Sequence, residues 1–340
     1  MAFAALRSEN SIWLFAGLYF LCYAPFTGLT KALASGAYPG SGAGVAGATL
    51  LPVATVASLA VLIVFLAVSG WLRYASSRTI AGRELPVPTR WTALSGLCTS
   101  IILTTTTLAY TFEGVSIVFV MLLMRGGVLV LAPIIDTLTG RRARWFSWVA
   151  LLLSLTSLWV AFAEVGGYRI TLVSGVDIGL YLLAYFVRLQ FMSRLAKSPD
   201  PDVTRRYFIE EQLMTTPVTM CTLVLLALWG RGEFMLQIRA GFTEFLSSGL
   251  VLPAALVGVG SQLVGIFGTL IFLDRRENTF SVPVNRCASV LAGVLASCVL
   301  ALTLGAAWPS AYQLVGAGLL VSAILVLGFA PAFARARGGT

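Results

Sequence analysis

The sequence contains no histidine among its 340 residues, and only 11% of the residues are charged. Metal sites and acid–base catalysis usually depend on clustered histidines or acids, and no such cluster stands out in the sequence. A glycine-rich phosphate loop is also absent, as is a serine or cysteine nucleophile beside a base. We therefore expect neither an enzyme nor a protein that holds a metal or a cofactor.

Cysteine is scarce, and its spacing carries no pattern. The chain has five cysteines and no Cys-x-x-Cys pair, and all five fall inside apolar stretches. We interpret them as small apolar residues, not as disulfide partners or metal ligands.

Hydrophobic residues are abundant instead, at 58% of the chain with a mean hydropathy of +0.90. That is more apolar surface than one soluble core can bury. A membrane helix needs about 20 apolar residues to cross about 30 Å of hydrocarbon. Ten stretches of that kind lie at about 11–34, 47–73, 91–111, 114–135, 145–163, 174–194, 207–229, 249–273, 280–304 and 309–331. The sequence predicts an all-α polytopic membrane protein with ten transmembrane helices.

The basic residues indicate how these helices are oriented. If the N-terminus is cytoplasmic, sixteen basic residues face the cytoplasm and four (Lys31, Arg169, Arg231 and Arg239) face the other side. Short loops rich in lysine and arginine stay on the cytoplasmic side. We predict a multi-pass protein of the inner (plasma) membrane with both termini cytoplasmic. Its net charge of +9 then follows from this orientation and requires no nucleic-acid partner.

Two spans carry a similar motif. FVMLLMRGGVL (119–129) and FSVPVNRCASVL (280–291) both place a phenylalanine six residues before an arginine. They are the fourth and ninth of ten spans, as a duplicated five-helix unit would give, and an odd number of helices inverts the second copy. We predict two inverted five-helix repeats, 1–168 and 169–340. Inverted repeats are typical of secondary transporters, whose substrate site lies near the membrane midplane.

The ten short-looped spans, the duplicated motif and the segment VMLLMRGGVLVLAPIIDTLTGRRARWFSWVALLLSLTSLWVAFAE (120–164) resemble the drug/metabolite transporter superfamily. The resemblance is to its EamA-like and nucleotide-sugar-transporter-related branches. It implies an alternating-access carrier whose cavity is lined by the third, fourth, eighth and ninth helices, with help from the first, sixth and seventh. The ninth span reads PVNRCAS and lacks the recognition run of the nucleotide-sugar carriers, so the resemblance does not supply the substrate.

Arg125 and Arg286 lie deep inside predicted spans. An arginine in mid-bilayer costs about 2.5–3.5 kcal/mol on insertion scales, so it normally faces an acid or a watery cavity. In one interpretation each is a structural cation paired with an acid such as Glu113, Glu164 or Glu211. In the other, both bind a phosphate or carboxylate through their forked donors. No acid lies in the central part of either span, which favours the second interpretation.

Further polar side chains are candidates for the same cavity. Asp177, Tyr181, Tyr185 and Arg188 share one face of the sixth span, where we expect Arg188 to extend to the cytoplasmic interface. The predicted substrate-binding residues are Arg125, Arg286, Asn285, Tyr19, Tyr23, Tyr181, Tyr185 and Gln262.

Three acids are candidates for proton coupling. Glu210 and Glu211 open the seventh span; we expect one to be solvated at the interface and the other to face inward, where it could bind a proton. Asp177 in the sixth span is the third.

These observations predict a secondary transporter that works by alternating access and carries a small anionic metabolite bearing phosphate or carboxylate. Two alternatives stay open: a flippase for a lipid-linked anion such as a polyprenyl phosphate, and an exporter of amino acids or other small amphiphiles. The expected partners are membrane lipid and the substrate.

Overall fold

The computed structural model describes residues 11–80, 82–108, 117–164 and 170–337, and these residues are mostly helical. The α-helices are α1 (Ser11–Ala34), α2 (Gly47–Ser69), α3 (Arg90–Leu108), α4 (Ile117–Leu138), α5 (Trp145–Glu164), α6 (Leu172–Phe191), α7 (Pro201–Trp229), α8 (Glu233–Phe242), α9 (Val251–Phe272), α10 (Asn278–Leu304) and α11 (Ala311–Arg337). The shorter elements are η2 (Trp71–Tyr74), β1 (Ser77–Ile80), β2 (Arg83–Pro86), η4 (Met192–Ala196) and η5 (Glu244–Ser247).

Nine helices in the described part of the chain are long and apolar enough to cross a membrane. The prediction of a multi-pass helical membrane protein is therefore confirmed. The expected third span corresponds to α3, which is 19 residues long and is not one of the nine. Its sequence carries six threonines, which lower its hydropathy. The short helix α8 lies between two predicted spans, in a stretch for which no helix was predicted.

Local signals define where the helices that carry the acids begin and end. Before α6, the side chain of Thr171 accepts a hydrogen bond from the backbone N–H of Ser174, and Ser174 bonds back in a capping box. Helix α7 starts with Pro201, whose missing N–H costs nothing in a first turn. It ends at Gly230, whose φ of 60° suits glycine.

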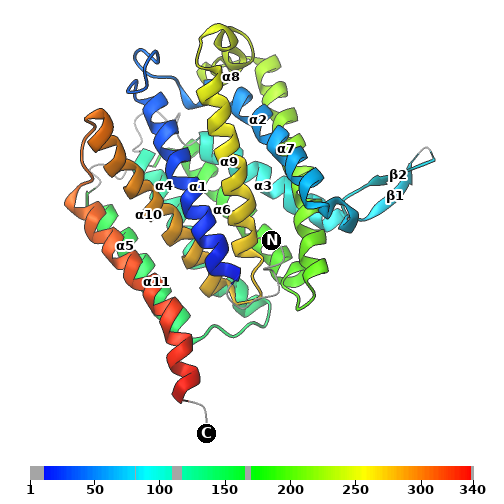
Figure 1. Ribbon diagram of the computed structural model, residues 1–340, viewed down its shortest axis with the longest axis vertical. Helices are drawn as coiled ribbons and strands as arrows, with labels where there is room; N and C mark the ends of the chain where they lie inside the picture. The colour runs from blue at the N-terminus through cyan, green and yellow to red at the C-terminus, as the bar shows by residue number, and fades with distance from the viewer. Residues whose placement is uncertain (1–10, 81, 109–116, 165–169, 338–340) are drawn as a thin grey trace.

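The long helices pack side by side in a bundle (Figure 1). Helix α1 lies against α9 and α10, α3 against α6 and α7, and α4 against α6 and α10, whereas α5 pairs with α11. Every residue of α10 from 278 to 289 is buried. Protein and not lipid therefore surrounds this half of α10.

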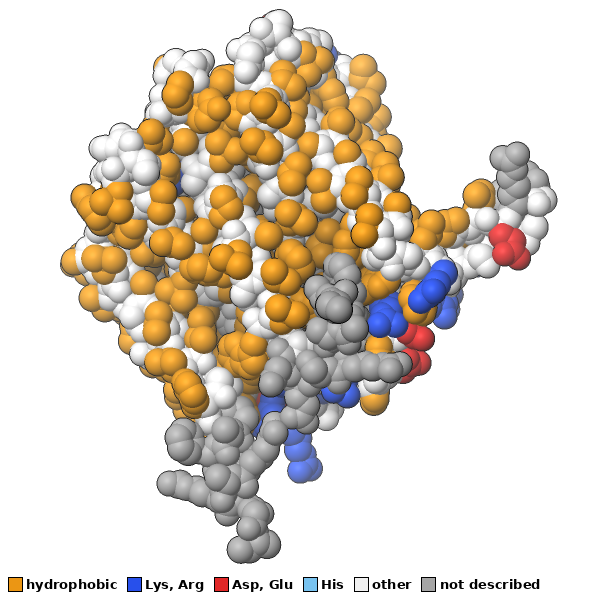
Figure 2. Space-filling view, in the orientation of Figure 1, with side chains coloured by type: hydrophobic (Ala, Val, Ile, Leu, Met, Phe, Trp, Pro, Cys, Tyr) orange, Lys and Arg blue, Asp and Glu red, His pale blue; other side chains and the backbone are white. Residues whose placement is uncertain are grey.

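The outer surface is apolar. Side chains such as Val68, Trp159, Leu172 and Leu228 are largely exposed. Figure 2 shows hydrophobic side chains across most of one face, with most of the visible charged side chains near its lower end and the β1–β2 hairpin. An apolar belt bounded by charge suits a protein whose solvent is lipid.

Strands β1 and β2 form an antiparallel hairpin between α2 and α3, with Ser77 opposite Pro86 and Ile80 opposite Arg83. The hairpin projects away from the bundle (Figure 1). An isolated two-stranded hairpin is at best marginally stable in water, so its base needs support from the rest of the protein.

Candidate functional site

Arg286 lies on α10, eight residues after the helix begins at Asn278. It is only 9% exposed, and its Nε and Nη2 atoms have no hydrogen-bond partner in the described protein. The guanidinium carbon lies 5.0 Å from the centroid of the Tyr185 ring. The ring face attracts the cation, but it leaves the donors on Nε and Nη2 free for a ligand.

Two tyrosines connect Arg286 with Arg125, and a third lies beside Arg286. Tyr19 and Tyr181 each lie close enough to both arginines to interact with them electrostatically, and Tyr185 does so with Arg286. The Tyr181 and Tyr185 rings are 4.9 Å apart between centroids. Arg125 is half-buried on α4. Helices α1, α4, α6 and α10 thus bring five residues of the predicted site into one cluster. These are Tyr19, Arg125, Tyr181, Tyr185 and Arg286.

The acids predicted as partners of Arg125 and Arg286 form no ion pair with them among the described residues. Glu211 pairs with Arg188, and Glu164 is exposed at the end of α5. Glu113 lies outside the described residues. Within the described ranges, neither Arg125 nor Arg286 belongs to any ion pair.

Gly268 on α9 allows Tyr19 and Asn285 to approach this cluster. A β-carbon at position 268 would lie 2.9 Å from Cε2 of Tyr19 and 3.3 Å from Nδ2 of Asn285, closer than side chains normally pack. Asn285 is buried beside Arg286 in sequence, and Tyr23 joins through Tyr19, with ring centroids 5.2 Å apart. Gln262 is different, because its Nε2 donates to Oε1 of Gln212 at 3.2 Å. This hydrogen bond pairs Gln262 with α7 and not with the arginines.

Glu211 is fully buried and is surrounded by donors. It accepts from Nε of Arg188 at 2.7 Å and from the hydroxyls of Ser95 and Thr99 at 2.9 Å each. Arg188 also donates to the Thr269 hydroxyl at 3.0 Å. The expectation that Arg188 extends to the cytoplasmic interface is wrong, because a buried carboxylate on α7 draws the guanidinium inward.

Glu210 is also fully buried, so the expectation that one of the two adjacent glutamates is solvated is wrong. Its carboxylate accepts from the backbone N–H of Ser76 at 3.0 Å and of Thr89 at 3.1 Å, and from the Ser76 and Thr92 hydroxyls and Nε of Arg206. Ser76 and Thr89 flank the β1–β2 hairpin. Glu210 therefore fixes both ends of the hairpin to α7, and both of its carboxylate oxygens accept hydrogen bonds.

Asp136, near the end of α4, is 1% exposed and was not singled out by the sequence. It accepts from the backbone N–H of Asn278 at 2.8 Å and of Thr279 at 2.7 Å, and from both of their side chains. These N–H groups belong to the first turn of α10, where no helical acceptor exists. Asp136 thus caps α10 from another helix. The one signal in the sequence was an acid in the last turn of a helix, where the helix dipole disfavours it.

Glu277 adds a second tie at the same end of the bundle. It accepts from Nε and Nη2 of Arg144 at 3.0 and 3.1 Å and from the Ser147 hydroxyl at 2.7 Å. Lys197 donates to the carbonyl of Arg276 at 2.8 Å. The connections after α4, after α6 and before α10 are therefore held together. This junction lies roughly 12 Å along α10 from Arg286, at a rise of 1.5 Å per residue.

Burial lowers the pKa of the Lys197 ammonium in this junction to about 8.

Glu277→Gln is expected to lower the stability of the protein at pH 7 by about 1–3 kcal/mol, the usual range for breaking a buried charged hydrogen bond. Burial opposes ionisation of Glu277, but hydrogen bonds from Arg144 and Ser147 outweigh it and hold the pKa of the carboxyl below its ordinary value. A lowered pKa contributes stability above the unfolded value of about 4.3 and loses it as pH falls further. Melting curves in detergent should therefore differ at pH 7 and converge only well below pH 4, as the pH falls through the lowered pKa of Glu277. A difference that is the same at pH 7 and at the lowest pH, or one shared by the exposed control Glu244→Gln, would contradict this account.

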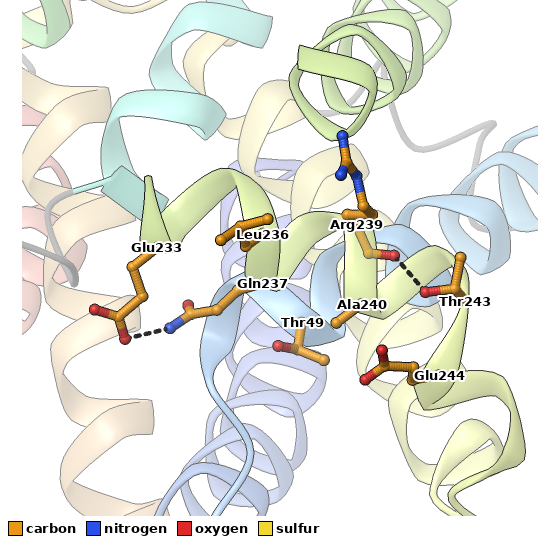
Figure 3. A pocket seen from close by; sticks show the side chains of 8 residues that line it. All are labelled: Thr49, Glu233, Leu236, Gln237, Arg239, Ala240, Thr243 and Glu244. Carbon is orange, nitrogen blue, oxygen red and sulfur yellow. Dashed lines mark hydrogen bonds between the residues drawn. The ribbon is translucent and has the colours of Figure 1, made fainter. Parts of the chain in front are cut away.

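The hollow shown in Figure 3 lies elsewhere, at α8. It measures about 400 Å³ and is lined by Thr49, Glu233, Leu236, Gln237, Arg239, Ala240, Thr243 and Glu244. Gln237 donates to Glu233 at 3.0 Å, and Arg239 donates to the last carbonyls of α7. Its charged residues are exposed, and none of the predicted site residues lines it. We therefore place the candidate site at the arginine and tyrosine cluster.

Fold and site together define a multi-pass helical membrane protein with a buried cationic and aromatic cluster. No protein-family model matches the chain, and no curated protein matches it. A solved structure described only as "Crystal structure of protein" is similar over 97% of this chain and 100% of that chain, with 17% sequence identity and a TM-score of 0.56. At this identity the similarity shows a shared fold and says nothing about activity.

Proposed function

We propose that this protein is a secondary transporter that carries a small anion bearing phosphate or carboxylate across the membrane by alternating access. The observation that supports this most is Arg286, a buried guanidinium on a membrane-spanning helix with Nε and Nη2 unpartnered among the described residues. A buried charge whose donors are left unsatisfied is costly. An anion with two oxygens would supply both the missing acceptors and the opposite charge.

The second arginine strengthens the proposal. Arg125 and Arg286 share Tyr19 and Tyr181 as neighbours although they lie on different helices. Two cations that approach one group of tyrosines repel each other unless water or an anion lies between them. The cluster would bind an anion through Arg125 on α4 and Arg286 on α10.

The wider proposal concerns the architecture. In it, 1–168 and 169–340 are inverted five-helix repeats, with Arg125 and Arg286 at equivalent positions, and the chain belongs with the drug/metabolite transporters. Both termini would be cytoplasmic in the inner membrane. The capping of α10 by Asp136 and the Glu277 tie would then close the cytoplasmic end. We propose a carrier and no enzymatic activity.

Arg125→Ala is expected to weaken binding of the transported anion by about 10- to 100-fold, the effect of removing a hydrogen bond to a charged group. Arg125→Lys should restore only part of the affinity, because an ammonium lacks the planar two-donor fork. The measurement is ligand-dependent thermal stabilisation of purified protein across a panel of phosphates, carboxylates, amino acids and polyprenyl phosphate. The panel also separates the carrier from the flippase and from the amino-acid exporter.

The matched control is Arg142→Ala, which removes an exposed arginine in the connection after α4. It should bind like the unmodified protein. If Arg125→Ala instead unfolds at a much lower temperature and regains stability when Glu113 is neutralised, Arg125 is a structural cation and the proposed site is wrong.

A further inference from the structure

Asp177 is a buried acid with a carboxylate oxygen that is unpartnered among the described residues. It lies on α6, is 4% exposed, and its Oδ2 atom has no hydrogen-bond partner in the described protein. No described cation lies within ion-pair distance of it. The two other acids considered for proton coupling are the opposite case, since Glu210 and Glu211 are each held by several donors.

None of the described charged groups on the elements that pack most against α6 forms an ion pair with Asp177. Helix α3 carries Arg90 at its exposed start and Cys98 beside the Arg188–Glu211 pair. Helix α4 carries Arg125 and, at its far end, Asp136; η4 carries the exposed Arg194. On α6 itself, Tyr181 is one turn away from Asp177, with Tyr185 and Arg188 further along.

This environment favours the neutral carboxyl. An ionised carboxylate buried without a hydrogen bond or a cation is strongly disfavoured, whereas a protonated one is tolerated. Ionisable groups inside membrane spans commonly mark proton pathways. Glu210 and Glu211 are unsuited to this role, because protonation of either would break a set of hydrogen bonds that the structure already satisfies.

We propose that Asp177 is the proton-binding site that couples transport to a proton gradient, and that it is protonated in the conformation seen here. The inference rests on the proposed transport function. The carboxyl takes up one proton when its site opens to one side of the membrane and releases it as an ionised carboxylate and a free proton when the site opens to the other. Tyr181, one turn along α6, also neighbours Arg125 and Arg286. An anion at the arginines and a proton at Asp177 therefore act on the same helix.

The first test needs no substrate. Infrared difference spectra of the purified protein, recorded across a step from neutral to alkaline pH, should show loss of a protonated carboxyl band. That band should be missing in Asp177→Asn and present in Asp202→Asn, which removes an exposed acid at the start of α7. A carboxyl band unchanged by Asp177→Asn would overturn the proposal.

The second test uses proteoliposomes and radiolabelled inorganic phosphate or succinate, whichever the binding panel supports. A pH gradient should drive accumulation by the unmodified protein, and Asp177→Asn should lose at least tenfold of it while exchange of internal for external anion stays within threefold. Accumulation that persists in Asp177→Asn, or that follows a sodium gradient, overturns the coupling proposal. Absence of binding and exchange in the unmodified protein is a failure of the proposed function instead, and the infrared result still stands or falls alone.

Discussion

Arg286→Ala protein is expected to fold, to melt at a temperature equal to or above that of the unmodified protein, and to lose detectable binding of the transported anion. The reason for the unchanged stability is that Arg286 belongs to no ion pair among the described residues, so its removal leaves no acid without a counter-charge and loses only the contact with Tyr185. Removing a buried charge that has no counter-ion relieves a desolvation cost. The loss of binding should be the largest of any single arginine substitution, because this guanidinium is buried and its Nε and Nη2 donors are unpartnered among the described residues.

Thermal unfolding in detergent with and without ligand measures both effects on one sample. Arg286→Lys separates charge from geometry, since it keeps the cation and loses the fork. A fall of many degrees in the ligand-free melting temperature of Arg286→Ala would show that the residue holds the bundle together. Unchanged anion binding would remove it from the site.

Arg188→Ala is expected to destabilise the protein by about 3–5 kcal/mol, the usual effect of leaving one member of a buried ion pair alone. Glu211 is fully buried and its shortest hydrogen bond, 2.7 Å, comes from Nε of Arg188. The double variant Arg188→Ala with Glu211→Gln should recover much of the loss, because the neutral amide can be buried without a counter-charge. Melting temperatures of the two single variants and the double variant form the cycle that measures this coupling.

Arg206→Ala is the matched control. Arg206 also bonds a fully buried glutamate, Glu210, but its own side chain is 51% exposed and the carboxylate keeps donors from Ser76, Thr89 and Thr92. Its substitution should cost about 1 kcal/mol or less, as for an exposed pair. Equal losses for Arg188→Ala and Arg206→Ala, or no recovery in the double variant, would contradict the account of a buried pair.

The membrane spans could be predicted because hydropathy depends only on composition and length, and the helix bounds agree with the expected stretches to within a few residues at most ends. The short helix α8 was missed because ten residues are too few for that signal. The polar contacts in the interior were harder to predict from the sequence. Arg188 has the same local sequence context whether it reaches for the interface or folds inward, and only Glu211 on another helix decides between the two.

The two glutamates show the same limit in a different way. Adjacent residues on a helix point about 100° apart, which suggests that one of Glu210 and Glu211 faces water. The hairpin base covers one direction and helix α3 with Arg188 covers the other, and neither is visible in the local sequence. Arg125 and Arg286 were recognisable because a charge in an apolar span is conspicuous. Tyr19 and Tyr181 were also predicted, but the sequence could not show that α1 and α6 place them beside both arginines.

Asp136 has a consequence for how quickly the molecule can change shape. Its four hydrogen bonds converge on one carboxylate and reach two consecutive residues of α10. A displacement of α10 that weakens one of these bonds misaligns the others, so they are lost together and not in succession. Structural changes built on such joints switch between discrete arrangements. This end of the bundle should therefore open as an all-or-none event in which the four Asp136 bonds break together.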